Sequence, residues 1–437
     1  MLFSSTRNLA TKVGLSKALS DGIAPDGGLY VPERFPALQV GDFEGVSGLA
    51  AIAERFLAPF FSSDPLGPHL ADIAADAFNF PAPVKRVSVA GGKLSVLELF
   101  HGPTAAFKDF GARFLAACLS RIPRADSRPL TILVATSGDT GGAVAAAFHK
   151  RPGVRVVVLY PEGLVSPLQE HQLNCWGDNV SSIAVRGNFD DCQRMVKQAF
   201  ADRTLAHAMQ LSSANSINVG RLLPQAAYYA ASSLDLWRAE GACPGYVIPS
   251  GNLGNVLACL WARRSGLPVG EVVLAHNANR AVVEFLATGE WQPRPSVATL
   301  ASAMDVGNPS NMERLRVLHP EWRDLAVQVS AYSVDDDAIR TRIAGDFTVL
   351  GETWCPHTAT AAEVYARLPA DSRRALHWVL VATAHAAKFR EIVEPLIGEE
   401  VELPPALAGL LALPAHHDTL PAELDALRDY LLALRNP

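Results

Sequence analysis

The sequence lacks paired cysteines, an apolar leader and any hydrophobic run long enough to cross a membrane. Its six cysteines include no C-x-x-C pair, so they fit neither a zinc site nor a disulfide framework and favour a reducing compartment. The first residues, MLFSSTRNLATKVG, have no apolar signal-peptide core, and no apolar run reaches the ~18–20 residues that a bilayer requires. We therefore expect a cytoplasmic protein with no membrane partner and no metal.

A strong excess of one charge is also missing. The 38 basic and 44 acidic residues give a net charge of −6, and no basic face is long enough to follow a nucleic acid. This balance excludes a polyanion partner but is compatible with a small phosphate ligand, because a few amides and one or two cations suffice to bind it. A hydrophobic content of 49% and a length of 437 residues indicate a globular protein of two or three domains.

The first 83 residues form a predicted unit of their own. Turn residues APDGG at 24–28 and a helical pattern at 48–61 precede a Ser/Pro/Gly-rich break at 62–68. We therefore predict an amino-terminal domain over 1–83 and a second region over 84–437.

Beyond residue 84, buried strands alternate with glycine turns and helices. The strand patterns lie at 131–135, 154–160, 246–248, 271–275 and 377–382, and the clearest helical patterns lie at 143–148, at 167–176 and from 256 onward. This order predicts a mostly parallel α/β sheet, whose ligands bind at the carboxyl ends of the strands. The Ala- and Leu-rich residues 405–435 are predicted to form terminal helices that cover a surface.

One lysine stands in unusually apolar company, in the segment HGPTAAFKDF at 101–110. Partial desolvation disfavours an ammonium and lowers its pKa, which prepares the amine of Lys108 to attack a carbonyl group. A lysine that extends its head to solvent from a helix start explains the same residue. The segment alone leaves both interpretations open.

Two glycine-rich loops follow predicted strands. ATSGDTGG at 135–142 brings amides and hydroxyls to the start of a helix, where an anion is favoured, although it matches neither a Walker loop nor G-x-G-x-x-G. PSGNLGN at 249–255 has two glycines that let the backbone approach a ligand, and its successive amides suit a phosphate. Either loop by itself is equally explained as an ordinary tight turn.

The order of these three segments is typical of pyridoxal-phosphate (PLP) enzymes of fold type II. The sequence further resembles the threonine synthase family, in its longer-chain bacterial and fungal branch, through ordered motifs that cover nearly the whole chain up to about residue 400. These motifs are APDGGLYVP (24–32), HGPTAAFKDF, TSGDTGGAV (136–144), NSINVGRLLPQ (215–225), PSGNLGN, NPSNMERL (308–315), PHTATA (356–361) and ATAHAAKF (382–389).

The resemblance implies a tryptophan-synthase-β-like α/β fold. Two open, mostly parallel α/β domains would be joined by a small amino-terminal domain at 1–83. Within the catalytic region 84–437, a smaller mobile subdomain would span roughly 112–222, and the remainder would form the larger one.

The resemblance also implies a set of site residues. Lys108 would form the Schiff base with pyridoxal 5′-phosphate and later move protons, and Thr383 would meet the pyridine nitrogen with a neutral hydroxyl that leaves it largely unprotonated. Asp139 would lie beside the cofactor's O3′, where it must share a proton or pair with the Schiff-base system. The full cofactor-binding set is Lys108, Asp139, Gly251, Asn252, Leu253, Gly254, Asn255 and Thr383.

The implied substrate-binding residues fall in two groups. Ser137, Gly138 and their loop amides would take the substrate carboxylate. The residues around the substrate's phosphate would be Thr140, Ser216, Asn218 and Arg221, of which Arg221 offers a bidentate guanidinium. Four more residues would line or brace the site without an assigned role, namely Asn311, Arg314, His357 and Lys388.

The activity implied is conversion of O-phospho-L-homoserine and water to L-threonine and phosphate, the last step of threonine biosynthesis, by a monomer or homodimer. One alternative is a phospholyase that releases 2-oxobutyrate, ammonia and phosphate from the same substrate. A β-replacing or dehydratase relative and a non-catalytic PLP-binding protein are two further readings. Intact Lys108 weighs against the last of these.

Overall fold

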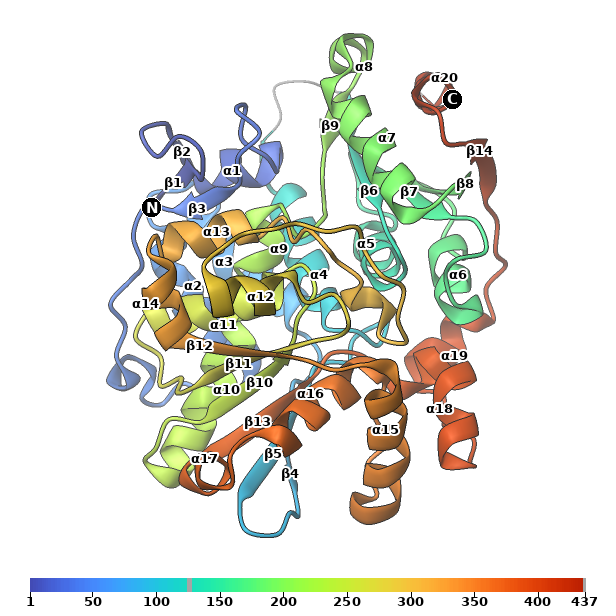
Figure 1. Cartoon of the computed structure of the whole chain (residues 1–437). Helices are drawn as coiled ribbons and strands as arrows, with labels where there is room; N and C mark the ends of the chain where they lie inside the picture. The colour runs from blue at the N-terminus through green and yellow to red at the C-terminus, as the bar shows by residue number, and fades with distance from the viewer. Residues whose placement is uncertain (124–127, 435–437) are drawn as a thin grey trace.

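Three β-sheets organise the computed structural model, which describes residues 1–123 and 128–434 (Figure 1). The predicted regions 84–437 and 112–222 therefore include short segments, 435–437 and 124–127, that lie outside the described residues. No described helix combines the length and hydropathy that are needed to cross a bilayer.

The amino-terminal residues form a small antiparallel sheet of order β2-β1-β3 flanked by helices. The predicted helix at 48–61 is confirmed as α2, whose Ile52, Phe56 and Phe60 recur at helical spacing and are buried. The elements are β1 (Leu2–Ser5), β2 (Lys12–Gly14), α1 (Leu15–Asp21), β3 (Tyr30–Pro32), η1 (Val40–Phe43), α2 (Leu49–Phe61), η2 (Gly67–His69) and α3 (Leu70–Ala77).

The largest sheet has six strands in the order β12-β11-β10-β13-β5-β4 and is parallel except for the edge strand β4. The predicted strands at 246–248, 271–275 and 377–382 are its three central members. The strands are β4 (Val84–Val87), β5 (Lys93–Glu98), β10 (Gly245–Pro249), β11 (Val272–His276), β12 (Val329–Ser333) and β13 (His377–Ala382).

The helices and short 3-10 turns that follow or cover these strands run along the whole second half of the chain. They are α10 (Gln225–Glu240), α11 (Gly254–Arg264), α12 (Ala281–Thr288), η3 (Ser302–Met304), α13 (Met312–Leu318), α14 (Trp322–Gln328), α15 (Asp336–Leu350), α16 (Pro356–Arg367), α17 (Ala370–Ala375), η4 (Ala386–Phe389) and α18 (Arg390–Ile397).

The third sheet has five parallel strands in the order β14-β8-β7-β6-β9. The predicted strands at 131–135 and 154–160 are its central pair, β6 and β7. Its strands are β6 (Leu130–Ala135), β7 (Val154–Pro161), β8 (Val180–Arg186), β9 (Gln210–Ser212) and β14 (Asp418–Pro421), and the nearby helices are α4 (Lys108–Leu119), α5 (Asp139–Phe148), α6 (Pro167–Asn174), α7 (Phe189–Ala201), α8 (Arg203–Ala208), α9 (Val219–Leu222), α19 (Pro405–Leu411) and α20 (Leu424–Ala433).

The carboxyl-terminal region differs from the prediction of helices alone over 405–435. Between α19 and α20, strand β14 pairs in parallel with β8 and extends the smaller sheet, so the end of the chain returns to that sheet (Figure 1). Helix α20 then packs beside α7 on the outer face of the sheet, where Leu427 and Leu431 are buried. A boundary of the smaller subdomain at 222 therefore omits residues 418–421, which belong to its sheet.

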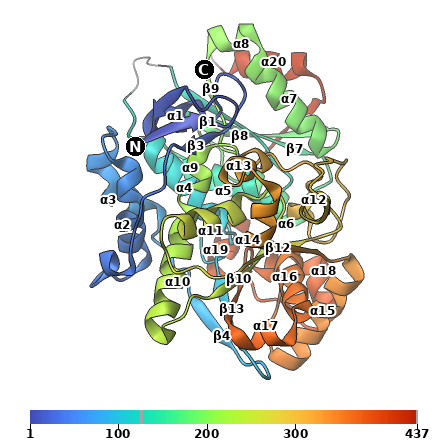
Figure 2. The ribbon, with the colours of Figure 1, turned by 60° about the vertical axis from the view of Figure 1, so that its left-hand side comes forward.

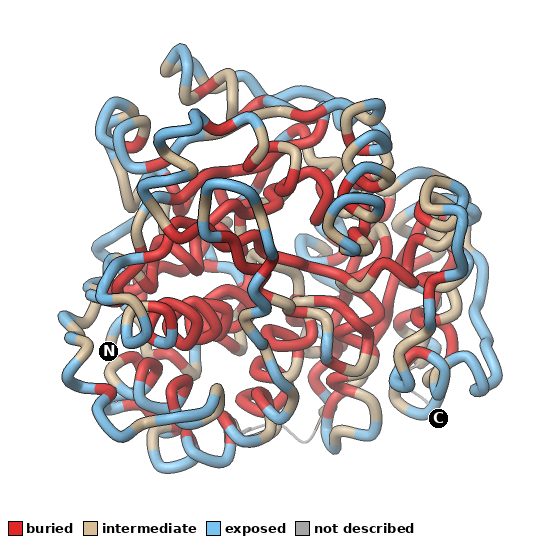
Figure 3. The backbone as a smooth tube through the Cα atoms, turned by 90° about the horizontal axis from the view of Figure 1, so that it is seen from below, coloured by how far each residue is buried: buried red, intermediate tan, exposed pale blue. Residues whose placement is uncertain are grey.

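One continuous core joins the amino-terminal helices to the inner faces of both large sheets. In β10, Tyr246 and Ile248 face this core while Val247 faces a second cluster, because successive side chains of a strand point to opposite faces. Helix α2 packs on α10, and α3 on α4 (Figure 2). Buried backbone runs through the centre of the molecule (Figure 3), so the amino-terminal domain shares its core with the catalytic region.

Candidate active site

Lys108 is the first residue of α4 and lies next to the carboxyl end of β13. The Phe107 amide donates a hydrogen bond to the Thr383 carbonyl at 2.9 Å, and Ala106 pairs with Ala384 in an isolated antiparallel bridge. These backbone contacts join two segments that lie far apart in the sequence. They bring the predicted cofactor lysine beside the predicted partner of the pyridine nitrogen.

The Lys108 ammonium is strongly desolvated, although the residue as a whole retains some exposed surface. Burial lowers the pKa of Lys108 to about 8, and the nearby cations Arg221 and Lys388 act in the same direction against the opposing effect of Asp139. An amine with a pKa near 8 is partly in its free-base form at neutral pH, and the free base is the form that attacks a carbonyl carbon.

The loop between β10 and α11 is shaped to receive an anion. Leu253 adopts a left-handed conformation with φ of 62°, which is uncommon for a residue with a side chain. Within the described part of the chain, the five amides of residues 251–255 donate no hydrogen bond to another residue. Unpaired amides at a helix amino terminus are a ready anion site.

Asn252 connects this loop to two other motifs. Its side-chain Nδ2 donates to Ser216 Oγ at 2.6 Å, and its side-chain Oδ1 accepts from the Ser310 backbone amide at 2.6 Å. Its backbone carbonyl accepts from Asn311 Nδ2 at 2.9 Å. The motifs at 215–225 and 308–315 therefore hold the loop from both sides.

Asn255 presents an unused donor. Its side-chain oxygen accepts from Tyr228 Oη at 2.5 Å and Tyr229 Oη at 2.8 Å, which fixes the orientation of the amide group. The Nδ2 atom is buried and has no partner among the described residues. A buried donor without a partner is costly, so it suggests a ligand acceptor at this position.

The loop between β6 and α5 is held from within by Thr136. Its hydroxyl accepts from the amides of Gly138 at 3.0 Å and Gly141 at 2.9 Å. The amides of Ser137, Asp139 and Thr140 make no hydrogen bond with a described residue, so three donors remain at the amino terminus of α5.

Asp139 is buried and pairs with a second lysine. Its Oδ1 lies 2.7 Å from Lys388 Nζ and accepts from Gln169 Nε2 at 3.0 Å. Burial raises the pKa of Asp139, but the cations Lys388 and Lys108 outweigh that effect and hold the pKa below its ordinary value. The residue is therefore an anion beside Lys108.

Arg221 is buried, and among the described residues it forms no ion pair. One guanidinium nitrogen donates to the Ala214 carbonyl, another donates to the Lys108 carbonyl at 3.4 Å, and Nε has no partner. Burial lowers the pKa of Arg221 to about 10, with a partly opposing effect of Asp109. A buried cation with an unused donor favours an anionic ligand.

Asn218 and Thr383 differ in whether a side-chain hydrogen-bond donor remains unused. Asn218 caps α9 and donates both amide hydrogens, to the Leu19 carbonyl at 3.0 Å and the Ser213 carbonyl at 2.9 Å. In this conformation it has no N–H left for a phosphate. The Thr383 hydroxyl, by contrast, makes no hydrogen bond with a described residue and is available to a ligand.

The four residues without a predicted role are all buried and brace the site. Arg314 donates to the carbonyls of Tyr30, Ser216 and Ile217, and it also donates to Asn311 Oδ1 at 2.7 Å. His357 accepts the Ala303 amide through Nε2 at 3.1 Å, and burial lowers the pKa of His357 to about 4, so the ring is neutral.

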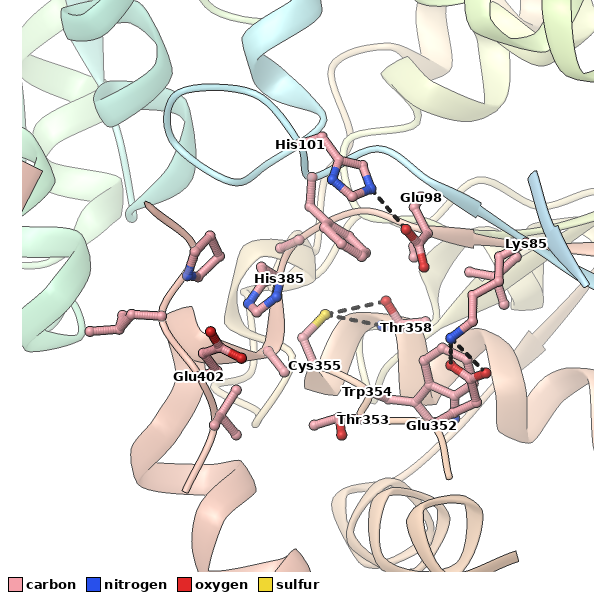
Figure 4. A pocket seen from close by; sticks show the side chains of 18 of the residues that line it. Lys85, Glu98, His101, Glu352, Thr353, Trp354, Cys355, Thr358, His385 and Glu402 are labelled. Atoms are coloured by element: carbon pink, nitrogen blue, oxygen red, sulfur yellow. Dashed lines mark hydrogen bonds and ion pairs between the residues drawn. The ribbon is translucent and has the colours of Figure 1, made fainter. Parts of the chain in front are cut away.

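A separate cavity of about 780 Å³ lies at the end of β13, where Ala382 is part of its wall (Figure 4). Its wall includes Ala384 and His385, but none of the predicted cofactor or substrate residues. It is lined by five glutamates against a single lysine, Lys85, which disfavours an anionic cofactor. The converging residues around Lys108 are the better candidate site.

Comparison with known proteins agrees with this geometry. Family models match residues 81–384 (pyridoxal-phosphate dependent enzyme), 2–78 (threonine synthase N terminus) and 358–431 (threonine synthase, C-terminal). The threonine synthase of Serratia marcescens is 40% identical over 97% of this chain and 97% of its own length.

Solved structures give the same result. The crystal structure of threonine synthase from Escherichia coli superposes with a TM-score of 0.90 at 38% identity, covering 99% of this chain and 100% of that one. The PLP-bound threonine synthase from Brucella melitensis superposes with a TM-score of 0.92 at 31% identity and covers 100% of both chains.

The fold and the site thus define a PLP-dependent enzyme of fold type II, as the sequence predicts. Its cofactor is pyridoxal 5′-phosphate. Within this class the chain belongs to the threonine synthase family, and its activity is that of threonine synthase. The free amides at 251–255 and the unpartnered Asn255 Nδ2 fit the cofactor's phosphate.

The loop at 251–255 offers a test with matched glycines. A Cβ at Gly254 would lie 3.7 Å from Ser216 Cβ, an ordinary contact that the fold can accept. If the amides of 251–255 bind the cofactor phosphate, a branched side chain there would hinder its approach. We expect Gly254→Val to weaken PLP binding about 10- to 150-fold, the equivalent of one lost bond to a charged group. Cofactor titration and thermal unfolding measure the two effects separately.

Gly251→Ala in the same loop gives a contrast: its Cβ would lie 2.8 Å from Met304 Cα, so this variant should lower the melting temperature as well as the PLP affinity. Unchanged PLP affinity in Gly254→Val would mean that the phosphate is held elsewhere.

Proposed function

We propose that this protein converts O-phospho-L-homoserine and water into L-threonine and phosphate, using the residues around Lys108. The observation that carries the proposal is a second buried group that lacks an anionic partner. Arg221 is a buried cation without an anionic partner among the described residues, and it is separate from the free amides of 251–255. An enzyme with a phosphorylated cofactor and a phosphorylated substrate needs two separate groups of residues to bind the two phosphates.

Lys108 bonds to the cofactor and then serves as the proton carrier. When bound, PLP withdraws electrons from the substrate's α-carbon and so acidifies its protons. Burial lowers the pKa of the Lys108 amine to about 8, so this amine can take protons from the α- and β-carbons and return them near neutral pH.

The loop at 137–140 binds the substrate carboxylate. The free amides of Ser137, Asp139 and Thr140 at the amino terminus of α5 support this role, together with the Ser137 hydroxyl. The Gly138 amide is already bonded to Thr136, so Gly138 acts through its conformation, with φ of 140° and ψ of −103°. A Cβ there would meet Gln169 at 2.6 Å.

Arg221, Ser216 and Thr140 hold the substrate's phosphate, and Asn218 supports them. The Ser216 hydroxyl already accepts from Asn252, so its own hydrogen remains available for an anion. Because Asn218 spends both amide hydrogens on carbonyls, we propose that it fixes the turn that carries Ser216 and Arg221. Thr383 meets the pyridine nitrogen, and Asp139 faces the cofactor's O3′.

The products of a purified-enzyme assay test this function. We expect L-threonine and phosphate in equal amounts from O-phospho-L-homoserine, with little 2-oxobutyrate or ammonia. Equal amounts of 2-oxobutyrate, ammonia and phosphate would instead establish the phospholyase reaction. No observation of the site favours that second reaction over the first.

The cellular setting is inferred from the cysteines. The cysteines of the described chain are free thiols, five of them buried, which suits the reducing cytoplasm. We propose that the enzyme works there as a monomer or homodimer, on a small-molecule substrate alone. We also propose domain boundaries near 83 and 222, with residues 418–421 added to the smaller subdomain.

A further inference from the structure

A second lysine lies in the site. The Lys388 side chain is completely buried on η4, directly after β13, and its ammonium contacts Asp139 Oδ1 at 2.7 Å and the Thr104 carbonyl at 2.7 Å. Buried ion pairs contribute little net stability, because desolvation offsets the attraction between the charges. A fully buried lysine at this position therefore calls for a role other than stability.

Asp139 is shared between the two lysines. Its Oδ1 already receives Lys388 and Gln169, whereas Oδ2 accepts no hydrogen bond from a described residue. Asp139 also attracts the Lys108 nitrogen electrostatically. The two lysines come from different elements, α4 and η4, and only one of them is placed to bond to the cofactor.

We propose that Lys388 is a positioning residue that occupies Asp139 and so keeps this carboxylate from pairing fully with the nitrogen of Lys108. The Lys108 nitrogen can then form and break its bond to the cofactor, and it can gain and lose a proton. Without Lys388, Asp139 would be a buried anion that accepts only from Gln169 among the described residues, and a protonated Lys108, which also attracts it electrostatically, would neutralise it. The proposal rests on the assignment of Lys108 as the cofactor-bearing residue.

The charges around Lys108 give the direction of the effect. Asp139 raises the pKa of Lys108, while Arg221 and Lys388 lower it, and burial adds to the lowering. Removing Lys388 deletes one cation that lowers the pKa of Lys108, and it also frees Asp139, which raises that pKa. Both changes favour protonation at Lys108. The other charged or titratable groups facing this cluster are Asp109, neutral His357 and Cys355.

The experiment is a pH titration of the holoenzyme's visible absorption band, which reports protonation of the nitrogen that joins Lys108 to PLP. We expect Lys388→Met, of similar length but uncharged, to raise the midpoint by about one pH unit or more, as one uncompensated charge at close range does. The double variant Lys388→Met/Asp139→Asn removes the freed carboxylate as well, and its midpoint should return to within about half a unit of wild type.

Lys85→Met is the matched control, because Lys85 pairs with Glu352 at 3.0 Å outside the converging residues and should leave the midpoint unchanged. A Lys388→Met protein with a lower melting temperature but an unshifted midpoint overturns the proposal, since a purely structural lysine predicts that result. If the single variant does not fold, a double variant whose midpoint still rises by a full unit also overturns it. The titration uses no substrate, so its failure is distinct from failure of the product assay.

Discussion

Lys108→Ala should lose essentially all turnover, with kcat lower by more than about 10⁴-fold. Proton transfer by a positioned group alone contributes about 10²- to 10⁴-fold, and this variant also loses the covalent attachment of the cofactor. The variant leaves the loop at 251–255 untouched, where we propose that the cofactor phosphate binds, so the protein should still bind PLP, although more weakly. Cofactor content and steady-state rates measure the two effects.

Borohydride reduction provides the positive control for this variant. In the wild-type holoenzyme it should attach the cofactor irreversibly to the peptide that contains Lys108, and in Lys108→Ala it should attach none. Lys93→Ala, an exposed lysine that pairs with Glu240 at 2.8 Å, should keep wild-type activity and labelling. Labelling of a different lysine, Lys388 included, would contradict the assignment.

The fold was predictable from sequence wherever strands are buried on both faces. Strands β6, β7 and β13 are mostly apolar and almost wholly buried, and each lies within one residue of its predicted bounds. Strand β14, DTLP, has no apolar pattern and mostly exposed side chains, so only its backbone pairing with β8 defines it. An edge strand of this kind leaves no hydrophobic signal in a sequence.

The parts of the site that lie in one short motif could be predicted from sequence. Contacts between residues far apart in the chain depend on the topology and could not be predicted in the same way. The loops at 137–140 and 251–255 keep their amides free because of short glycine-rich turns, which a sequence shows directly. The pair of Asp139 and Lys388 joins positions far apart in the chain, across two sheets, and no local pattern predicts it.

Two buried arginines, Arg221 and Arg314, illustrate the same difference. Both lie within conspicuous motifs, yet Arg314 donates to three backbone carbonyls and Asn311, whereas Arg221 keeps a buried Nε without a partner among the described residues. Sequence alone does not distinguish an arginine that braces loops from one that can bind an anion. The hydrogen bonds of the two guanidinium groups do distinguish them.

Arg221→Ala should lower kcat/KM for O-phospho-L-homoserine about 10- to 150-fold. A hydrogen bond to a charged group is worth about 1.5–3 kcal/mol, and about 1.4 kcal/mol corresponds to a factor of ten. Cofactor content should hardly change if, as we propose, the cofactor phosphate binds at 251–255. Arg221→Lys should recover only part of the loss, since an ammonium restores the charge without the planar fork.

Substrates without a γ-phosphate separate this role from a structural one. Their slow reactions never use the Arg221 contact, so Arg221→Ala should leave those rates nearly unchanged. Arg314→Met is the matched control: it should lower the melting temperature and reduce the rates with phosphorylated and unphosphorylated substrates alike, because its saturated donors only brace the loops. If Arg221→Ala behaves like Arg314→Met, with equal losses for both kinds of substrate, Arg221 does not bind the substrate's phosphate. A loss confined to the phosphorylated substrate requires the guanidinium to meet that phosphate, because the two kinds of substrate differ only there.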